Sequence, residues 1–285
     1  MESIKFTNAD GDYITIAREG ATYRLDTLTG ITGLIADTQT QKGFETDGSI
    51  YINSLLLSRD IIFSFNIIGQ SSRDDLFEQR NDIVRIYNPK LGKGTLVYTN
   101  DYTSKTLNVT VDSTPVMTSQ QDNMGYHSGS MSVSLTANDP YFLDNFNTSV
   151  KLEDFVGGLQ FPIQFPISFA EKSAALVIDN DGDVEMPIIA EFRGIATNPI
   201  LTNTTTGEFI EVTRELLINE KLHIDTGAKT VIHESATGVM TNSFSSITLA
   251  STFFLIKKGE NTLTFGSDTG APEVYLTYKR KWVVV

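Results

Sequence analysis

The sequence predicts a mainly β protein with two domains and a single long helix. Short apolar-alternating runs, separated by turn-forming residues, follow one another along most of the 285 residues. One segment, 72–88, carries apolar residues at helical spacing instead. Hydrophobic residues make up 40% and charged residues 20%, which is the balance of a folded globular chain that can bury a sizeable core.

The first half of the sequence opens with a hairpin signal. Residues 4–7 and 13–17 are strand-like, and between them lies the turn-forming run Asn8-Ala9-Asp10-Gly11-Asp12. A strand, an Asp-Gly turn and a second strand are typical of a β-hairpin. Four further runs predict strands in this half: 50–57, 61–68, 107–111 and 131–136.

The segment 72–88 predicts a helix. Ser72 can cap its first turn by accepting a hydrogen bond from a free backbone N–H. Asp74 and Asp75 suit the positive end of the helix dipole, and Pro89 ends the helical pattern. The apolar residues fall on helical stripes at Leu76, Phe77, Ile83, Val84, Ile86 and Tyr87.

The second half predicts strand after strand, and closely spaced short strands with glycine turns are typical of a β-sandwich. In the last run, 273–284, Val274, Leu276 and Tyr278 share one face, as in a strand buried on one side. The polar residues of this run lie on the other face, at Thr277, Lys279 and Lys281. The other runs are 175–179, 187–194, 209–213, 222–225, 230–234, 251–256 and 262–265.

A pause in the strand pattern marks the expected domain boundary. It begins at Asn138-Asp139-Pro140, and the stretch after it, 141–170, is only loosely apolar and contains Pro162 and Pro166. We therefore place the boundary near residue 140, which gives an N-terminal domain of residues 1–140 and a C-terminal domain of residues 141–285.

Composition excludes several classes of protein. The chain has no cysteine, which excludes disulfides, thiolate metal sites and cysteine nucleophiles. The formal net charge of −13 argues against a broad DNA-binding face, because such faces neutralise phosphates with Lys and Arg. Residues 1–6 lack the apolar core of a signal peptide, and the most apolar run, 61–68, is too short to span a bilayer. We therefore expect folding in a cytoplasm and no membrane insertion.

Two histidine patterns are similar to catalytic or metal sites, and each falls short. His127-Ser128 lies within the glycine-flanked run 125–129, but a nucleophile elbow requires serine at the central position, which His127 occupies. His223 and Asp225 are two residues apart in a predicted strand and could share a face, but a zinc centre needs three or four ligands. A glycine-rich turn and a surface polar pair explain these patterns better.

Two loop patterns fall short in the same way. Asp179-Asn180-Asp181-Gly182-Asp183 begins like a calcium loop, but Val184 stands where the loop requires glycine and Ala190 where it requires glutamate. Gly92-Lys93-Gly94-Thr95 is similar to a phosphate loop, but Tyr87 replaces the first glycine. Both patterns predict turns. The sequence thus assigns no catalytic, cofactor-binding or metal-binding residue, and paired carboxylates cannot be judged without their separation in space.

A series of short cues extends over nearly the whole chain. The first half contributes Gly20 to Leu28, Arg59 just before a strand, the helix end Tyr87-Asn88-Pro89, and the phrase Ala137-Asn138-Asp139-Pro140-Tyr141-Phe142. The second half contributes Asn180-Asp181-Gly182-Asp183, Phe192-Arg193-Gly194, Asn203, Thr206-Gly207-Glu208, Leu222-His223-Ile224-Asp225-Thr226, Lys258-Gly259-Glu260-Asn261-Thr262-Leu263 and Tyr278-Lys279-Arg280-Lys281-Trp282. In this order, the cues resemble the distal tail protein (siphovirus tail component) family of phages and prophages of Gram-positive bacteria.

The resemblance implies both a fold and a function. The N-terminal domain is expected to be a β-barrel or split-barrel-like fold with one helix that forms a ring, and the C-terminal domain a galectin-like β-sandwich. Members of the family form a homohexameric ring, the hub of the tail tip or baseplate, which joins the tail tube to the tail-associated fibre or lysin protein and often to receptor-binding proteins. The resemblance implies no catalysis and no cofactor. DNA is expected to pass through the ring without specific binding, in a virion tail tip that is assembled in the bacterial host cytoplasm.

A second hypothesis stays open at this point, namely a carbohydrate-binding host-recognition module of the tail tip with the same sandwich fold. Sugar binding favours exposed aromatic rings, and the one tryptophan, Trp282, lies on a terminal strand where a role in packing is the better explanation. A third hypothesis, an enzyme acting on cell wall, has no motif to support it. The sequence does not name the residues of a ring interface.

Overall fold

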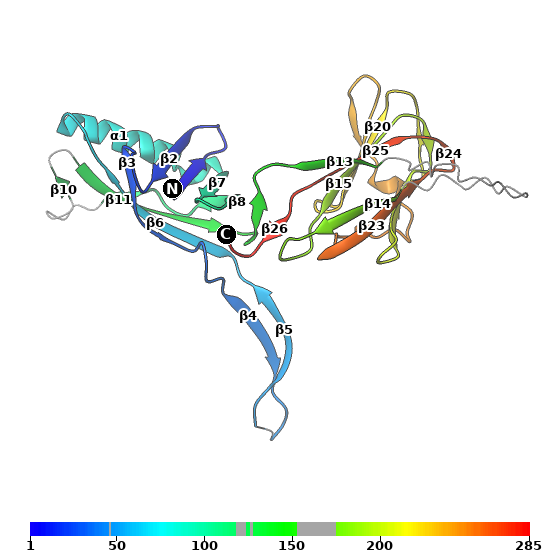
Figure 1. The fold of residues 1–285 in the computed structure, drawn as a ribbon, viewed down its shortest axis with the longest axis horizontal. Coiled ribbons are helices and arrows are strands. Elements are labelled where there is room, and N and C mark those ends of the chain that lie inside the picture. The colour runs from blue at the N-terminus through cyan, green and yellow to red at the C-terminus, as the bar shows by residue number, and fades with distance from the viewer. Residues whose placement is uncertain (46, 118–123, 126–127, 153–174) are drawn as a thin grey trace, which may run out of the picture. The chain divides into compact units, whose positions relative to one another are not determined.

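A computed structural model describes residues 1–45, 47–117, 124–125, 128–152 and 175–285, which fall into two compact units (Figure 1). The first unit comprises Met1–Asn145 together with Trp282–Val285, and the second comprises Phe146–Lys281. The chain therefore passes between the two units twice. The boundary expected from the sequence places residues 282–285 in the C-terminal domain, whereas in the structure Trp282 and Val285 pack against the hydrophobic core of the first unit.

A closed circuit of strands forms the body of the first unit. Neighbouring strands pair in the order β11, β6, β3, β2, β1, β7 and β8, and β8 pairs with β11 to close the circuit into a barrel. The strands of this sheet are β1 (Ser3–Thr7), β2 (Tyr13–Ala17), β3 (Tyr23–Thr29), β6 (Arg59–Ile67), β7 (Lys93–Thr99), β8 (Ser104–Val111), β9 (Val116–Met117), β10 (Met124–Gly125), β11 (Ser128–Ala137), β12 (Phe142–Asp144) and β26 (Lys281–Trp282).

Alternation of side chains explains why these strands form a barrel with one apolar face. In β6 every second residue from Arg59 to Ile67 is buried, and β11 pairs with it antiparallel over the full length of β6. Since successive side chains of a strand point to opposite faces, Phe63, Phe65 and Leu135 all lie inside. The opposite face of β11 carries only hydroxyl side chains, at Ser128, Ser130, Ser132, Ser134 and Thr136.

The predicted helix is confirmed as α1 (Arg73–Ile86). The Ser72 hydroxyl accepts a hydrogen bond from the backbone N–H of Asp75, as expected of an N-cap. Leu76 and Ile83 are buried against the barrel core. The helix is followed by a short 3-10 turn, η1 (Pro89–Leu91).

Tyr87, the residue that ends α1, is buried and anchors this helix to the barrel. Its ring stacks on that of Phe6 in β1, with 4.5 Å between the ring centroids. Burial raises the pKa of the Tyr87 phenol far above its ordinary value, so the side chain is neutral at physiological pH.

The second unit contains sheets of six, four and three strands among the described residues. The six-stranded sheet has the order β13, β25, β15, β20, β21, β22, and the four-stranded sheet the order β14, β23, β17, β18. Both contribute side chains to one core cluster, as the predicted sandwich requires. The bounds are β13 (Thr148–Leu152), β14 (Ala175–Asn180), β15 (Ile188–Arg193), β16 (Ala196–Thr197), β17 (Ile200–Asn203), β18 (Glu208–Glu211), β19 (Glu215–Leu216), β20 (Lys221–Asp225), β21 (Thr230–Glu234), β22 (Met240–Asn242), η2 (Phe244–Ser246), β23 (Gly259–Gly266), β24 (Thr269–Gly270) and β25 (Glu273–Tyr278).

Two predicted strands of this half differ from the structure. Residues 251–256 form no strand, since local turn bonds such as Phe254 N–H to the Thr252 carbonyl replace a ladder, and only Ile256 forms an isolated bridge. The run 273–284 is broken after Tyr278, because the chain there leaves the six-stranded sheet for the edge of the barrel sheet. The predicted inward face of β25 is confirmed, with Val274, Leu276 and Tyr278 all buried.

Candidate assembly surfaces

The histidine patterns do not converge on a catalytic or metal centre. His127 lies outside the described residues. His223 lies on the outer side of β20, where its Nε2 is 2.8 Å from Glu234 Oε2. Asp225 instead accepts hydrogen bonds at 2.8 and 2.9 Å from the backbone N–H groups of Gly227 and Ala228, so it shapes the turn after β20. Within the described residues no three His, Cys, Asp or Glu side chains gather in a way that could hold a metal ion.

The run that is similar to a calcium loop is a turn organised by a buried asparagine. Asn180 is fully buried, and its amide donates to the carbonyls of Val184 at 3.0 Å and Ile256 at 3.1 Å. Its side-chain oxygen accepts from the Gly182 N–H at 3.1 Å. Asn203 and Asn261 are buried as well and are bonded to each other at 3.3 Å. These family cues therefore satisfy buried backbone groups, which would be costly if left unpaired.

The run that is similar to a phosphate loop and the single tryptophan also have structural roles. Gly92 adopts a left-handed conformation with φ of 83° after η1, as a tight turn requires, and Lys93 already begins β7. Trp282 packs against the barrel core, and its indole N–H donates to Asp144 Oδ1 at 2.9 Å. Lys105 Nζ lies 4.1 Å from the centre of the Trp282 ring.

A two-stranded hairpin is the most unusual surface of the first unit. Strands β4 (Ala36–Gln41) and β5 (Ile50–Leu56) pair only with each other, and Figure 1 shows them running away from the ends of β3 and β6. We call residues 36–56 the arm. At the root of the arm, the Leu57 N–H donates to the Ile35 carbonyl at 3.0 Å. The strand 50–57 is predicted from the sequence, but β4 is not, because its sequence ADTQTQ has no apolar period.

The arm exposes apolar side chains that a monomer would normally bury. No described residue of β4 or β5 is fully buried, and Phe44 near the tip is 91% exposed. Isolated two-stranded hairpins are marginally stable in water, and contiguous exposed apolar surface marks interaction sites. The exposed apolar residues of the arm and its root are Ile35, Phe44, Ile50, Tyr51, Ile52, Leu55 and Leu57.

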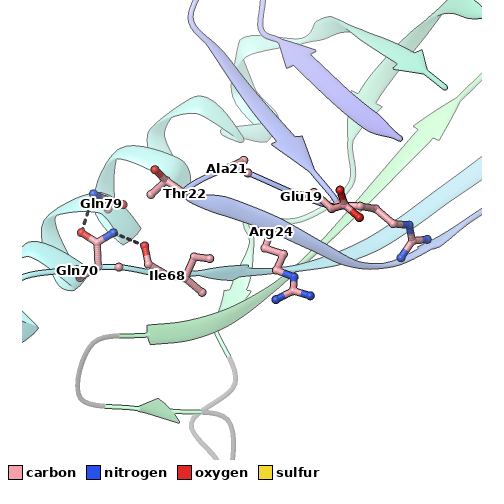
Figure 2. Close-up of a pocket in the computed structure, with 10 residues that line it drawn as sticks. Glu19, Ala21, Thr22, Arg24, Ile68, Gln70 and Gln79 are labelled. Atoms are coloured by element: carbon pink, nitrogen blue, oxygen red, sulfur yellow. Dashed lines mark hydrogen bonds between the residues drawn. The ribbon is translucent and has the colours of Figure 1, made fainter. Parts of the chain in front are cut away.

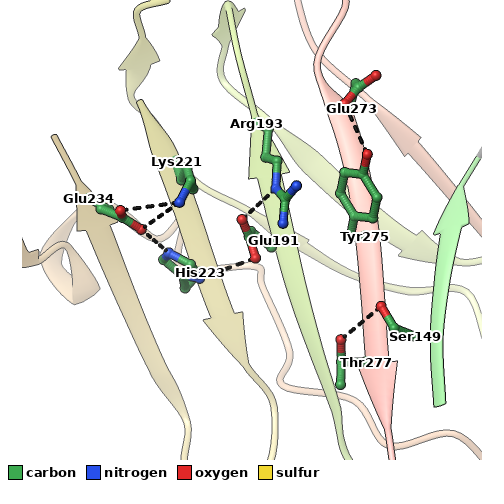
Figure 3. Close-up of polar contacts among 9 residues, drawn as sticks. All are labelled: Ser149, Glu191, Arg193, Lys221, His223, Glu234, Glu273, Tyr275 and Thr277. Atoms are coloured by element: carbon green, nitrogen blue, oxygen red, sulfur yellow. Dashed lines mark hydrogen bonds and ion pairs between the residues drawn. The ribbon is translucent and has the colours of Figure 1, made fainter. Parts of the chain in front are cut away.

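The outer face of the six-stranded sheet in the second unit carries charged side chains that pair with one another (Figure 3), beside the exposed Ile189 of β15. Across this face run the ion pairs Lys151–Glu273, Arg193–Glu191 and Lys221–Glu234, with nitrogen–oxygen distances of 2.8, 2.5 and 3.2 Å. We call this surface the charged face.

The Tyr275 ring on the charged face is already covered (Figure 3). The Arg193 guanidinium lies 4.1 Å from the centre of the Tyr275 ring. The Tyr275 hydroxyl donates to Glu273 at 3.1 Å. A sugar ring would have to displace Arg193 before it could stack on Tyr275.

An open hollow of about 640 Å³ lies beside the β2–β3 connection (Figure 2). Its lining includes Arg18, which pairs with Glu2 and donates to the Asp26 carbonyl at 3.1 Å. Gln79 of α1 donates to Gln70 at 2.8 Å on the opposite side of the hollow. The lining mixes acidic, basic and amide groups, which indicates no single class of small ligand.

No helix within the described part of the chain is both long enough and apolar enough to cross a membrane.

Comparison with known proteins places both halves of the chain in one class. The family described as "Phage tail protein RIFT-related domain" matches residues 18–137, and "Siphovirus-type tail component, C-terminal domain" matches residues 181–282. Together these two matches span most of the chain. No curated protein sequence matches it.

Solved structures share the whole fold at low sequence identity. The crystal structure of the SPP1 Dit protein (gp 19.1), described as a paradigm of the hub adsorption apparatus of phages that infect Gram-positive bacteria, is 10% identical with a TM-score of 0.70, and the match covers 98% of each chain. Chains of the phage P2 baseplate in its activated conformation, with calcium or with strontium, match over 100% of both chains. They are 12% and 13% identical, with TM-scores of 0.59 and 0.60. At these identities the match establishes a shared fold.

Proposed function

This chain belongs to the siphovirus-type tail component family, as a distal tail protein, and we propose that it forms a homohexameric ring that is the hub of a phage tail tip or baseplate. The families that match are structural components of phage tails, so the chain has a structural role in a tail or baseplate. We propose in addition that the chain forms a ring, that the ring binds other tail proteins, and that it catalyses no reaction.

The arm is the observation that carries the proposal. Ile50, Ile52 and Leu55 each expose half or more of their surface, on a hairpin that no other part of the described chain covers. Full burial of one such side chain is worth about 1.5–3 kcal/mol, so burial of several offsets the roughly 4–15 kcal/mol that association costs in lost freedom of motion. Burial against an apolar partner is therefore favourable, and in the proposed ring this partner is a second copy of the chain.

A closed ring needs two different patches on each subunit, in head-to-tail contact. The arm supplies one patch, because it reaches beyond the barrel from which it arises (Figure 1). The second patch lies on the neighbouring subunit's barrel, where edge backbone groups and the exposed face of the sheet are available for contact. The number six comes from the family, and images of the assembled ring test it separately.

The proposed partners of the ring follow from the place of the family in a tail. The ring joins the tail tube to the tail-associated fibre or lysin protein and, in some tails, to receptor-binding proteins. The second unit is the docking domain for these distal partners, in a galectin-like arrangement. With a net charge of −13, the chain repels phosphates, so DNA passes through the ring without being bound. Assembly takes place in the host cytoplasm.

The alternative role, carbohydrate recognition by the second unit, gains no support from the charged face. Sugar-binding sites need polar groups that are available to hydroxyls, whereas Glu191, Glu234 and Glu273 are already engaged by cationic neighbours. Arg193 already covers the Tyr275 ring, so this ring is not free for stacking on a sugar.

Light scattering on the purified chain over a dilution series tests the proposal. The account expects a mass six times that of the 31.5 kDa chain at high concentration, with dissociation on dilution. Addition of the tail tube protein should shift the assembly to lower concentrations, because each ring then gains a second contact surface. A species that keeps the mass of one chain at every concentration, with and without the tube protein, would contradict it.

A further inference from the structure

Arg59 is a buried cation held by backbone carbonyl groups. Only 2% of its surface is exposed. Its Nε donates to the Pro140 carbonyl at 2.8 Å, and its Nη1 donates to the carbonyls of Gly30 and Ile31 at 2.7 and 2.8 Å. Its Nη2 donates to the Val283 carbonyl at 2.6 Å. No carboxylate is paired with Arg59 in any interaction found among the described residues.

These carbonyls come from three segments that are distant in the sequence. Gly30 and Ile31 lie on the segment 30–35, which leads from β3 into the arm. Arg59 follows the segment 57–58, which leads from the arm into β6. We call these two segments the legs of the arm. Pro140 precedes β12, and Val283 belongs to the segment that returns from the second unit. One guanidinium thus ties both legs of the arm to the outgoing and returning segments of the first unit.

The backbone at the root of the arm is closely packed at Gly30. Gly30 has φ of 89°, a conformation that suits glycine, and a Cβ at this position would lie 1.9 Å from the Asp60 carbonyl oxygen. Gly33, three residues further along the same leg with φ of 77°, has open space around it. The close contact is therefore specific to the point where Arg59 holds the leg.

The returning segment, Trp282–Val285, is anchored independently of Arg59. Trp282 bonds to Asp144 and lies beneath Lys105, and both Trp282 and Val285 pack against the barrel core. The Val283 carbonyl is therefore presented to Arg59 from a fixed backbone. The Phe142 ring, 4.7 Å from the guanidinium carbon, closes the other side.

Burial lowers the pKa of the Arg59 guanidinium from its ordinary value to about 10, and the group is still charged at neutral pH. A buried cation is tolerated only where hydrogen bonds replace its lost water, and here carbonyls supply them. A lysine at this position would have three N–H donors on one nitrogen and could not reproduce the four hydrogen bonds that Arg59 makes from three nitrogens.

We propose that Arg59 and the returning segment Trp282–Val285 form a latch that fixes the direction of the arm, so that assembly through the arm requires residues at the far end of the chain. This inference rests on the proposed function. In it, Arg59 is a positioning residue, which touches no partner and acts through the arm.

Hydrogen exchange on the wild-type chain, kept monomeric by dilution, tests the latch directly. The Leu57 amide, bonded to the Ile35 carbonyl at the arm root, should exchange nearly as slowly as the amides of β6, while amides in the middle of the arm exchange at least ten-fold faster. If the Leu57 amide exchanges as fast as the middle of the arm, the latch does not hold the root and the proposal is overturned.

Two variants of the full chain then connect the latch to assembly: Arg59→Lys and a chain that stops at Lys281. At a temperature where circular dichroism shows both fully folded, each should require at least ten-fold higher concentration for half-assembly and should lose protection at Leu57. The matched control is Arg24→Lys, at an exposed arginine on β3, which should assemble like wild type. Folded variants that assemble at the wild-type concentration would overturn the proposal.

If a variant fails to fold, the exchange rate of the Leu57 amide in the wild-type chain still decides whether the latch exists. If the wild type itself stays monomeric at every concentration, the proposed ring fails. The Leu57 exchange rate still shows whether the latch exists.

Discussion

The arm and the charged face are both exposed β-structure, but the charged face exposes paired charges and the arm exposes apolar side chains. On the charged face, Lys221 and Glu234 or Arg193 and Glu191 pair within the subunit, so the surface is complete in a monomer. On the arm, Ile52 and Leu55 face solvent on a hairpin that no other described part of the chain covers. Exposure to water is favourable for the ion pairs of the charged face and unfavourable for the apolar side chains of the arm. An exposed strand is therefore informative about assembly only when its side chains are considered.

Removal of the arm is the strongest way to break this comparison. Replacement of residues 36–56 by a short Gly-Ser turn between Ile35 and Leu57, which are already bonded at 3.0 Å, should abolish assembly and leave the barrel folded. Light scattering and circular dichroism measure the two effects. A similar Gly-Ser replacement of the exposed turn 236–238 in the second unit is the control. An armless chain that still assembles would show that the arm is not the interface.

A matched pair of substitutions sharpens the comparison. Ile52 on the arm is 58% exposed, and Ile189 on the charged face is 43% exposed. Ile52→Asp places a charge where the partner must pack, so the concentration for half-assembly should rise at least ten-fold, or about 1.4 kcal/mol. Ile189→Asp should leave it unchanged. Equal effects on assembly from the two variants would remove the distinction between the two surfaces.

The pH dependence of the charged face gives a smaller effect. A hydrogen bond from His223, and next one from Lys221, hold the pKa of Glu234 below its ordinary value of 4.5. A lowered carboxyl pKa stabilises the fold above the unfolded value, and this contribution is lost as pH falls through the folded value. Wild type should therefore melt slightly above Glu234→Gln at pH 6, and the gap in Tm should close by about pH 3. A gap that stays constant over this range would contradict the assignment.

The smallest expected signal is in carbohydrate binding. A glycan array or a cell-wall pull-down with the full chain should show no retention through the charged face, because Arg193 covers the Tyr275 ring at 4.1 Å. Arg193→Ala, which uncovers the ring, is the sharper probe. Clear binding by the wild type that Tyr275→Ala removes would add a receptor role to this surface.

The elements that sequence predicts well are those set by local chemistry. The helix α1 follows from its cap at Ser72 and from the spacing of Leu76 and Ile83, and β21 (Thr230–Glu234) agrees residue for residue with the expected strand. In both cases burial of one face imposes a period on the sequence.

What the sequence does not reveal depends on contacts across long separations or on surfaces without burial. Strand β4 has no buried face, so it carries no apolar period. Arg59 is visible as a residue before a strand, but its partners lie 28, 29, 81 and 224 positions away, and no local pattern encodes them. The break after Tyr278 is hidden because Lys279 and Lys281 continue the alternation of the polar face that Thr277 begins.

The central claim is that the arm joins copies of this chain into a closed ring, and class-averaged electron micrographs of the purified protein test it most directly. The account predicts closed rings of six subunits in the wild type and none in the chain without residues 36–56. Wild-type fields that contain only single particles of 31.5 kDa, or open filaments in place of rings, would contradict it.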